Sequence, residues 1–299
     1  MDRLVTRLAT SVALCLVAVC CGRATGDATS AGPAPPRVAV MAPAAAEMLE
    51  ELRLLDRVVG IGDYGPWPRS IADRPSLGSY DAPNAEAVLS LQVDLLLTTA
   101  SDAGAATHRR LEALGVRVIA LDTSTYGGIF DSLERVGQAF GKETEAAASA
   151  ERLRGRMREI ERRGATAAPR RVLFVVGRDP LYVAGPGSHV DEMIRMVGGC
   201  NVADDALSPY QQVSLEAILE RMPEVIIDSS DNRPGALRGR SPGGWGRWGF
   251  LPAVREDRVY WVDPGRLVIP GLRLPEMTVL MGKLIQPELF GETTPSELE

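Results

Sequence analysis

The sequence predicts an α/β fold with two lobes, each containing a mostly parallel sheet, joined by a single long helix. The first observation behind this is an internal repeat: residues 84–97 (NAEAVLSLQVDLLL) return in altered form as residues 214–227 (SLEAILERMPEVII). Each copy places a capping residue before a Glu, a short amphipathic run, an acidic residue and an apolar run typical of a strand covered on both faces. Two lobes of this kind can enclose a cleft.

The second observation is that strand and helix patterns alternate in both halves, which favours parallel sheets. The first half opens with a predicted strand at 37–41, a helix at 44–55 and a strand at 58–61. The second opens with a strand at 171–176 and a helix at 188–197 that ends at a Gly-Gly pair. The repeat also extends further along the chain, because residues 111–122 correspond to residues 251–263.

The third observation is a run of strong helix formers with charges at i,i+4 spacing between the two halves. We assign residues 37–141 to the first lobe, 142–168 to the linking helix, 169–291 to the second lobe and 292–299 to a tail. A helical linker bends less than extended strands would. We therefore expect the lobes to close only modestly on a ligand.

The N-terminus has the pattern of an export signal. Arg3 and Arg7 precede an apolar run at 11–19 that is too short to span a bilayer. The following residues resemble a lipoprotein cleavage box, so residues 1–20 are interpreted as the signal, Cys20 or Cys21 as the acylated residue, and 21–36 as a flexible tether. This predicts a lipid-anchored protein in the periplasm or on the outer face of the cytoplasmic membrane. An ordinary signal cleaved near Ala24 is the alternative.

Composition narrows the function. A net charge of −6 provides no broad basic surface for nucleic acid. Three of the four cysteines lie in the leader, which leaves Cys200 alone in the mature domain and allows no internal disulfide there. We expect Cys200 to be a small buried packing residue.

Two catalytic or cofactor-binding motifs match the sequence in residue spacing, but neither has the flanking strand and helix that such a motif requires. Residues 239–243 match the spacing of a nucleophile elbow, but no strand or helix pattern flanks them, and both His108 and His189 precede the Ser. Residues 244–249 match a dinucleotide fingerprint only by letter. Two isolated histidines do not suggest a zinc site. We therefore expect no catalytic residues, no metal site and no cofactor, and an α/β hydrolase-type enzyme remains a distant alternative.

Aromatic residues gather in the predicted loops at strand ends, although they make up only 5% of the chain. In parallel α/β sheets, ligands bind beyond the carboxyl ends of the strands. Flat rings with polar edges suit a large, partly apolar ligand, although such rings can also simply cover the ends of a sheet. The residues are Tyr64, Trp67, Tyr80, Tyr126, Tyr182, Tyr210, Trp245 and Trp248.

Several of these segments together resemble the helical-backbone class of substrate-binding proteins, which serve ABC importers of metal chelates. They are residues 84–86 with the following strand, 177–185 (GRDPLYVAG), 198–202 (GGCNV), 213–216 (VSLE) and 270–273 (PGLR). The resemblance covers about residues 37–288 and is strongest to the cobalamin-binding branch. It implies a monomeric protein that captures a chelate, here cobalamin or another corrinoid, and delivers it to a permease.

The resemblance also implies roles for individual residues. Aromatic positions of the cleft fall on Trp67, Tyr80, Tyr182 and Tyr210, with Tyr64 and Trp245 as further candidates, and an arginine position falls on Arg273. One surface glutamate per lobe, which pairs with permease arginines, falls on Glu86 and Glu216; a Glu at a helix start is also favoured by the helix dipole without any partner. One departure matters, because a further tryptophan of that branch meets Thr98 or Thr99.

Other ligands and roles stay open. A ferric-siderophore protein would use arginines, for which Arg178, Arg266 and Arg273 are candidates. A haem protein needs an axial ligand, which Tyr64 or Tyr126 could supply. A lipid-anchored scaffold without a ligand would not explain the ring of aromatic residues.

Overall fold

The computed structural model describes residues 35–100, 104–230, 239–240 and 243–298. Residues 36–299 form one compact unit. Cys20, Cys21 and the leader lie outside the described residues. Among those described, no helix combines the length and apolarity needed to cross a membrane.

The first lobe contains a four-stranded sheet in which every pair of neighbouring strands is parallel. The strand order is β2-β1-β5-β6, so the first strand of the chain lies inside the sheet. The strands are β1 (Val38–Val40), β2 (Val58–Ile61), β5 (Leu95–Thr99) and β6 (Arg117–Leu121), and a separate antiparallel pair is formed by β3 (Gly78–Ser79) and β4 (Ala82–Pro83). β1 is fully buried, as the continuous apolar run predicts.

Helices follow the strands of this lobe in turn, as the alternating pattern predicts. They are α1 (Pro43–Glu51), the 3-10 turn η1 (Leu55–Arg57), α2 (Ala85–Ser90), α3 (Ala105–Ala113) and α4 (Tyr126–Ala139). The predicted cap of α2 is confirmed: the Asn84 side chain accepts hydrogen bonds from the N–H groups of Glu86 and Ala87 at 3.0 and 3.1 Å.

The second lobe contains a mixed sheet, which is less parallel than the first. Its core, β7-β11-β13, is parallel, while β8, β10 and β12 add antiparallel pairs at the edges, and β9 pairs with the start of β7 in parallel. The strands are β7 (Arg170–Arg178), β8 (Leu181–Ala184), β9 (Gly199–Asn201), β10 (Tyr210–Gln212), β11 (Val225–Asp228), β12 (Gly239–Arg240) and β13 (Val259–Trp261). β7 pairs with β8 through a short connection, which requires an antiparallel arrangement.

The helices of the second lobe are mostly short. They are α6 (His189–Met196), α7 (Leu215–Glu220), the 3-10 turn η2 (Gly243–Arg247), α8 (Pro252–Arg255), α9 (Pro264–Leu267), α10 (Leu274–Ile285), α11 (Pro287–Phe290) and α12 (Pro295–Leu298). α6 lies within the predicted range 188–197: Ser188 caps its start, and Gly198, whose φ is +81°, follows its C-cap Val197. Residues 292–298, expected as a tail, include α12, which packs Leu298 into the core.

The repeat in the sequence is a repeat in the structure, down to single hydrogen bonds. In the first lobe the Arg37 N–H donates to the Asp94 carboxylate at 2.8 Å, and in the second the Arg171 N–H donates to the Glu224 carboxylate at 2.9 Å. Each Arg also donates from Nε to a carbonyl just beyond the short helix of its repeat unit, Arg37 to Leu91 after α2 and Arg171 to Met222 after α7. The shared acidic residue therefore ties each repeated helix-strand unit to the first strand of its lobe.

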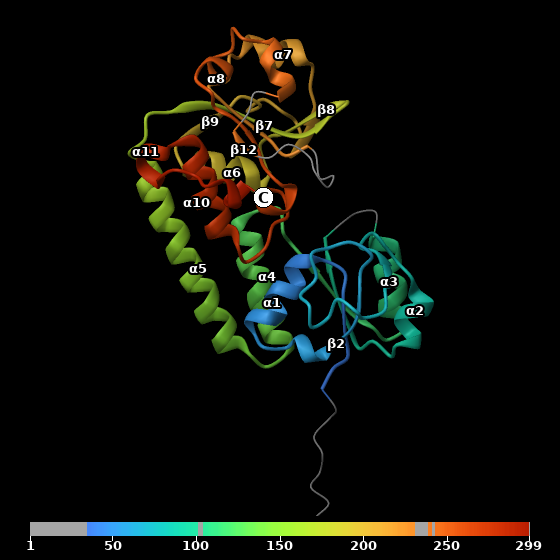
Figure 1. The fold of residues 1–299 in the computed structure, drawn as a ribbon. Coiled ribbons are helices and arrows are strands. Elements are labelled where there is room, and N and C mark those ends of the chain that lie inside the picture. Colours follow the sequence, from blue (N-terminus) through green and yellow to red (C-terminus); the bar gives the residue numbers. More distant parts are fainter. Residues whose placement is uncertain (1–34, 101–103, 231–238, 241–242, 299) are drawn as a thin grey trace, which may run out of the picture. The chain divides into compact units, whose positions relative to one another are not determined.

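The two lobes are joined by α5 (Glu143–Gly164), the long helix predicted between them (Figure 1). It packs against α4, α6 and α10. One apolar cluster is continuous from Val38 in the first sheet, through Leu153 in α5, to Phe174 in the second sheet. Because apolar surface is shared in this way, separating the lobes would expose part of the core to water.

The expectation that Cys200 is a buried packing residue is wrong. Its side chain is exposed, whereas its neighbours Gly199 and Asn201 in β9 are buried. Side chains alternate between the two faces of a strand, so the one residue between two buried neighbours points outward.

Candidate functional site

A hollow of about 500 Å³ lies at the carboxyl ends of the parallel strands in the first lobe. Tyr64, which follows β2, and Tyr80, between β3 and β4, both line it, together with Pro43 and Thr99. Tyr64 is 82% exposed and Tyr80 is 50% exposed. Two rings that remain open to solvent at this edge of the sheet can contact a ligand, as the sequence predicts.

The loop that carries Tyr80 is fixed by its backbone. The Thr98 hydroxyl is buried and donates to the Tyr80 carbonyl at 3.2 Å, while Thr99 lines the hollow. Of Thr98 and Thr99, the two residues that can stand where the related branch has a further tryptophan, Thr99 is the one that lines the hollow.

In the second lobe, Tyr182 and Tyr210 lie on the antiparallel pair β8 and β10. The register opposes Tyr210 to Ala184 and Gln212 to Tyr182, so both tyrosines are on the same face. They are diagonal neighbours, a spacing at which aromatic side chains reach one another. Each is 39% exposed. Burial of part of its ring raises the pKa of Tyr210 to about 12, so its hydroxyl is neutral at ordinary pH.

Two of the predicted aromatic residues are more enclosed than these tyrosines. Trp67 is half-buried, packs against the main apolar cluster and stands beside Gly65, whose missing side chain leaves room for its ring. Trp245 is only 2% exposed, and its Nε1 donates to the Asp228 carboxylate at 2.8 Å. The prediction of Trp245 as a ligand contact is therefore corrected: an indole whose faces and N–H are satisfied inside the protein cannot also stack on a ligand.

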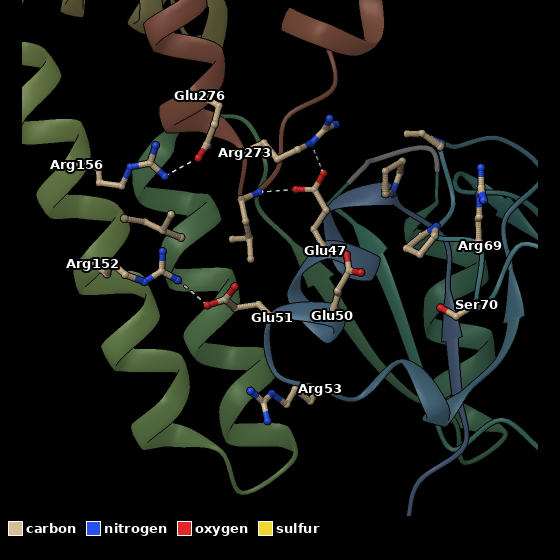
Figure 2. A pocket seen from close by; sticks show the side chains of 15 residues that line it. Glu47, Glu50, Glu51, Arg53, Arg69, Ser70, Arg152, Arg156, Arg273 and Glu276 are labelled. Carbon is tan, nitrogen blue, oxygen red and sulfur yellow. Dashed lines mark hydrogen bonds and ion pairs between the residues drawn. The ribbon is translucent and has the colours of Figure 1, made fainter.

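Arg273 lies in a second, larger hollow of about 1000 Å³, shown in Figure 2. The hollow is bordered by α1, α5 and the start of α10, and Pro43 lines both this hollow and the aromatic one. Arg273 donates from Nε to Glu47 of α1 at 2.8 Å. The arginine implied by the resemblance therefore lines a separate hollow and already has a carboxylate partner.

The charged hollow contains five arginines and four glutamates, most of them in pairs. Besides Glu47 and Arg273, α5 contributes two further ion pairs, Arg152 with Glu51 at 2.6 Å and Arg156 with Glu276 at 2.5 Å (Figure 2). These pairs cross between α5 and helices of both lobes.

The other two arginines proposed for an anionic chelate are also engaged. Arg178 donates from Nε to the fully buried Asp228 at 2.9 Å, and its guanidinium lies 4.3 Å from the centre of the Trp261 ring. Arg266 donates to the Ser296 carbonyl at 3.3 Å. Cation–π contact and a buried carboxylate both hold Arg178 in place.

Candidate axial ligands for haem are mostly enclosed. The Tyr126 hydroxyl is buried, and burial raises the pKa of this phenol, which opposes the phenolate that binds iron. His108 is 8% exposed and His189 is 2% exposed. Burial lowers the pKa of both imidazoles, that of His189 to about 4. Within the part of the chain that the structure describes, no three His, Cys, Asp or Glu side chains gather as a metal site.

Glu86 and Glu216 occupy equivalent places, one in each lobe. Each is the second residue of a six-residue helix, after the caps Asn84 and Ser214, and each is exposed. No ion pair or side-chain hydrogen bond is recorded for either carboxylate among the described residues. The geometry leaves both free to meet a partner.

Sequence reasoning missed Glu47 and Asp228, the carboxylates that hold Arg273 and Arg178. A signal for Glu47 exists, since it is an acidic residue flanked by the buried Ala46 and Met48 in an apolar helix. Asp228 ends a buried strand, where an unpaired charge would be costly. Both patterns indicate a carboxylate with a partner, but neither indicates which arginine it holds.

The fold and the site together define a two-lobed α/β protein with exposed aromatic residues in both lobes. Residues 38–264 match the family model described as periplasmic binding protein, so the chain belongs to this family. Its members are substrate-binding proteins of ABC transporters, not enzymes.

Three known proteins illustrate the likeness. An uncharacterised ABC transporter substrate-binding lipoprotein of Bacillus subtilis is 27% identical over 86% of this chain and 82% of its own. The vitamin B12-binding protein of Yersinia pestis is 27% identical over 64% of this chain and 69% of its own. The structure of a periplasmic heme-binding protein in complex with two hemes superimposes with a TM-score of 0.70 at 27% identity, covering 84% of this chain and 97% of the other.

Proposed function

We propose that this protein is an extracytoplasmic substrate-binding lipoprotein that captures a corrinoid such as cobalamin in its cleft and delivers it to an ABC permease. The observation that carries the proposal is the pair of exposed tyrosines in each lobe, Tyr64 with Tyr80 and Tyr182 with Tyr210. Rings from both lobes suit a large ligand with broad apolar faces.

The site suits a metal that arrives inside a chelate. The described residues hold no group of side chains able to bind a bare metal ion, and the phenol of Tyr210 is neutral. Neutral phenols offer a ring face and a hydrogen bond, which match a macrocycle with amide side chains. The protein then recognises the chelate by its surface and leaves the metal to its own ligand.

The comparisons do not choose between ligands, because a vitamin B12-binding protein and a heme-binding protein are equally similar at 27% identity. The site supports the corrinoid. A haem protein would need an axial ligand, and of the two candidates only Tyr64 is exposed. A ferric-siderophore protein would use free arginines, and the three arginines that the resemblance offers for this role are engaged: Arg178 and Arg273 pair with carboxylates, and Arg266 donates to a backbone carbonyl. Haem coordinated by Tyr64 is the second candidate.

Calorimetric titration of the purified protein with cyanocobalamin, haemin and a ferric siderophore tests the ligand. Replacing Tyr80 or Tyr182 with Ala should weaken corrinoid binding roughly tenfold or more, because burying a large side chain contributes about 1.5–3 kcal/mol. Leu114→Ala is the matched control, since Leu114 is 51% exposed at the C-terminal end of α3, away from the strand ends. Tight haemin or siderophore binding without corrinoid binding would contradict the proposal.

The leader and the two glutamates complete the proposal. Cys20 or Cys21 anchors the protein through acyl chains, and the relative from Bacillus subtilis is itself named a lipoprotein. Two or more chains make such anchoring stable. Mass spectrometry of the native protein checks this point, and an unmodified N-terminus beyond residue 21 would contradict it.

Glu86 and Glu216 are proposed to dock on permease arginines, one for each lobe. A carboxylate and an arginine form a charge-assisted, often bidentate pair, which at an exposed rim sets orientation and encounter rate more than affinity. The double variant Glu86→Ala, Glu216→Ala should bind ligand normally and support little uptake. The control is Glu112→Ala, Glu220→Ala, which removes two other exposed glutamates. Normal uptake in the first double variant would contradict the docking role and leave Glu86 and Glu216 with only the favourable interaction of a Glu with the start of a helix.

A further inference from the structure

The Glu47 carboxylate is fully occupied by the segment that carries Arg273. One oxygen accepts from Arg273 Nε at 2.8 Å, and the other accepts from the Leu272 N–H at 2.7 Å (Figure 2). The Glu47 side chain is only 20% exposed. It is therefore held in one position from two directions, unlike a mobile surface ion pair.

Gly271 is part of the same arrangement. An ideal Cβ at this position would lie 2.2 Å from a Glu47 carboxylate oxygen. Because a real Cβ never approaches that closely, the close contact depends on glycine. The chain thus provides the space, the backbone donor and the side-chain donor that keep Glu47 against Arg273.

The pairing changes what Arg273 offers to a ligand. Glu47 engages Nε, and no partner is recorded for the two terminal nitrogens within the described part of the chain. Those nitrogens can still donate hydrogen bonds. The positive charge behind them is balanced by a carboxylate in direct contact, so a ligand several ångströms away meets a dipole instead of a full charge.

Arg178 is arranged in the same way. Its Nε donates to Asp228 at 2.9 Å, and the Asp228 side chain is fully buried. Arg178 at the end of β7 and Arg273 before α10 are therefore each compensated by a carboxylate on another element, whereas Arg53 and Arg69, at the exposed border of the charged hollow, have no ion pair among the described residues. A site meant to attract anions would leave such arginines unpaired, since repulsion from the carboxylates weakens the binding of negative groups.

We propose that Glu47 is a specificity-determining residue, which makes the site favour chelates without net negative charge over anionic ones. This inference rests on the proposed function and extends it to the charge of the substrate. Arg273 serves as a hydrogen-bond donor to neutral acceptors such as amide oxygens, and Glu47 disfavours carboxylate-rich chelates. Neither role requires Glu47 to contact the ligand.

Glu47→Gln tests the proposal because it removes the charge and nearly preserves the shape. The probes are cyanocobalamin and a cyanocobalamin derivative in which side-chain amides are hydrolysed to carboxylates. The wild-type protein should prefer the neutral corrinoid. The variant should shift the ratio of the two dissociation constants roughly five- to tenfold toward the anionic one, with a smaller shift at high salt.

Glu50→Gln is the matched control, since Glu50 belongs to the same helix and lines the same hollow without a recorded partner among the described residues. Because the Glu50 side chain is exposed, solvent and salt screen its charge, and Glu50→Gln should shift the ratio much less than Glu47→Gln does. Gly271→Ala is a second perturbation, which displaces the carboxylate and keeps its charge in the protein. It should shift the ratio in the same direction as Glu47→Gln, and thermal unfolding of each variant confirms that it folds.

The outcomes separate this inference from the proposed function. Corrinoid binding with the same ratio in wild type and Glu47→Gln, or an equal shift in Glu50→Gln, would overturn the role of Glu47 and leave the corrinoid assignment standing. Binding of haemin alone would overturn the corrinoid assignment; the role of Glu47 would then stand only if Glu47→Gln, and not Glu50→Gln, tightened haemin binding. Binding of none of these ligands would overturn both.

Discussion

Acidification should destabilise this protein through one buried histidine, His189, the first residue of α6. Its side chain is 2% exposed, and its Nε2 lies 3.2 Å from the Leu267 carbonyl, to which it donates when the ring is neutral. Burial lowers the pKa of His189 from 6.5 to about 4. A cation here would also face the positive end of its own helix.

The sign of the effect follows from where the proton binds. Between about pH 4 and pH 6.5, the unfolded chain holds the proton on this histidine and the folded protein does not, so stability rises with pH. The stability that the folded protein keeps by holding His189 neutral is fully present above pH 6.5 and is lost as the pH falls toward 4. A difference of about 2.5 pKa units corresponds to roughly 3 kcal/mol in total, of which about 2 kcal/mol is lost between pH 7 and pH 5.

The assay is urea unfolding followed by tryptophan fluorescence at several pH values, for the wild type and His189→Gln. Glutamine keeps an amide donor for the Leu267 carbonyl and does not titrate. The free energy of unfolding of the wild type should fall by about 2 kcal/mol more than that of the variant between pH 7 and pH 5. Other titrating groups are present in both proteins, so their effects cancel in this difference. One of them is His108, whose pKa is also lowered by burial and which makes the stability of both proteins depend on pH. Equal slopes in the two proteins would refute the reasoning.

Three further predictions concern stability and exposure. Gly164→Ala should cost about 1–3 kcal/mol, because its Cβ would lie 2.0 Å from the Met196 carbonyl, whereas Gly155→Ala in the same helix should stabilise by about 0.5–1 kcal/mol; equal unfolding midpoints would contradict this. Asn84→Ala should cost about 1 kcal/mol in denaturant unfolding, since it removes the cap of α2, and an unchanged midpoint would show that the cap is dispensable. Cys200 should react with Ellman's reagent in the folded protein, and a thiol that reacts only after denaturation would contradict its exposure, with Cys200→Ala as the control.

The sequence by itself was enough for the features that depend on local pattern. The repeated helix-strand units, the caps Asn84 and Ser214, and the long helix α5 all follow from backbone hydrogen bonding and periodicity within a few residues. Both copies of the repeat have an acidic residue before the strand, Asp94 in the first and Glu224 in the second, and the structure confirms that these residues are equivalent. Their role in binding the first strand of each lobe became visible only in the structure.

The candidate site was predictable only in part. Tyr64 and Tyr80 are exposed in loops, as predicted, whereas Tyr182 and Tyr210, which were also expected in loops, are exposed on the strands β8 and β10. No sequence pattern separates these tyrosines from Trp245, because whether a ring turns outward or inward depends on its neighbours in space. Trp245 turns inward because Asp228 accepts its N–H.

Tertiary structure alone decided which charges meet in the charged hollow. Glu47 and Arg273 are 226 positions apart, and no local pattern links an acidic residue in α1 to an arginine before α10. Their contact exists because α1 of the first lobe packs against the start of α10, where Gly271 leaves room for a carboxylate. Local sequence determines which residues form each helix and strand, whereas long-range packing determines which charges meet, because a pairwise contact depends on the positions of both partners at once.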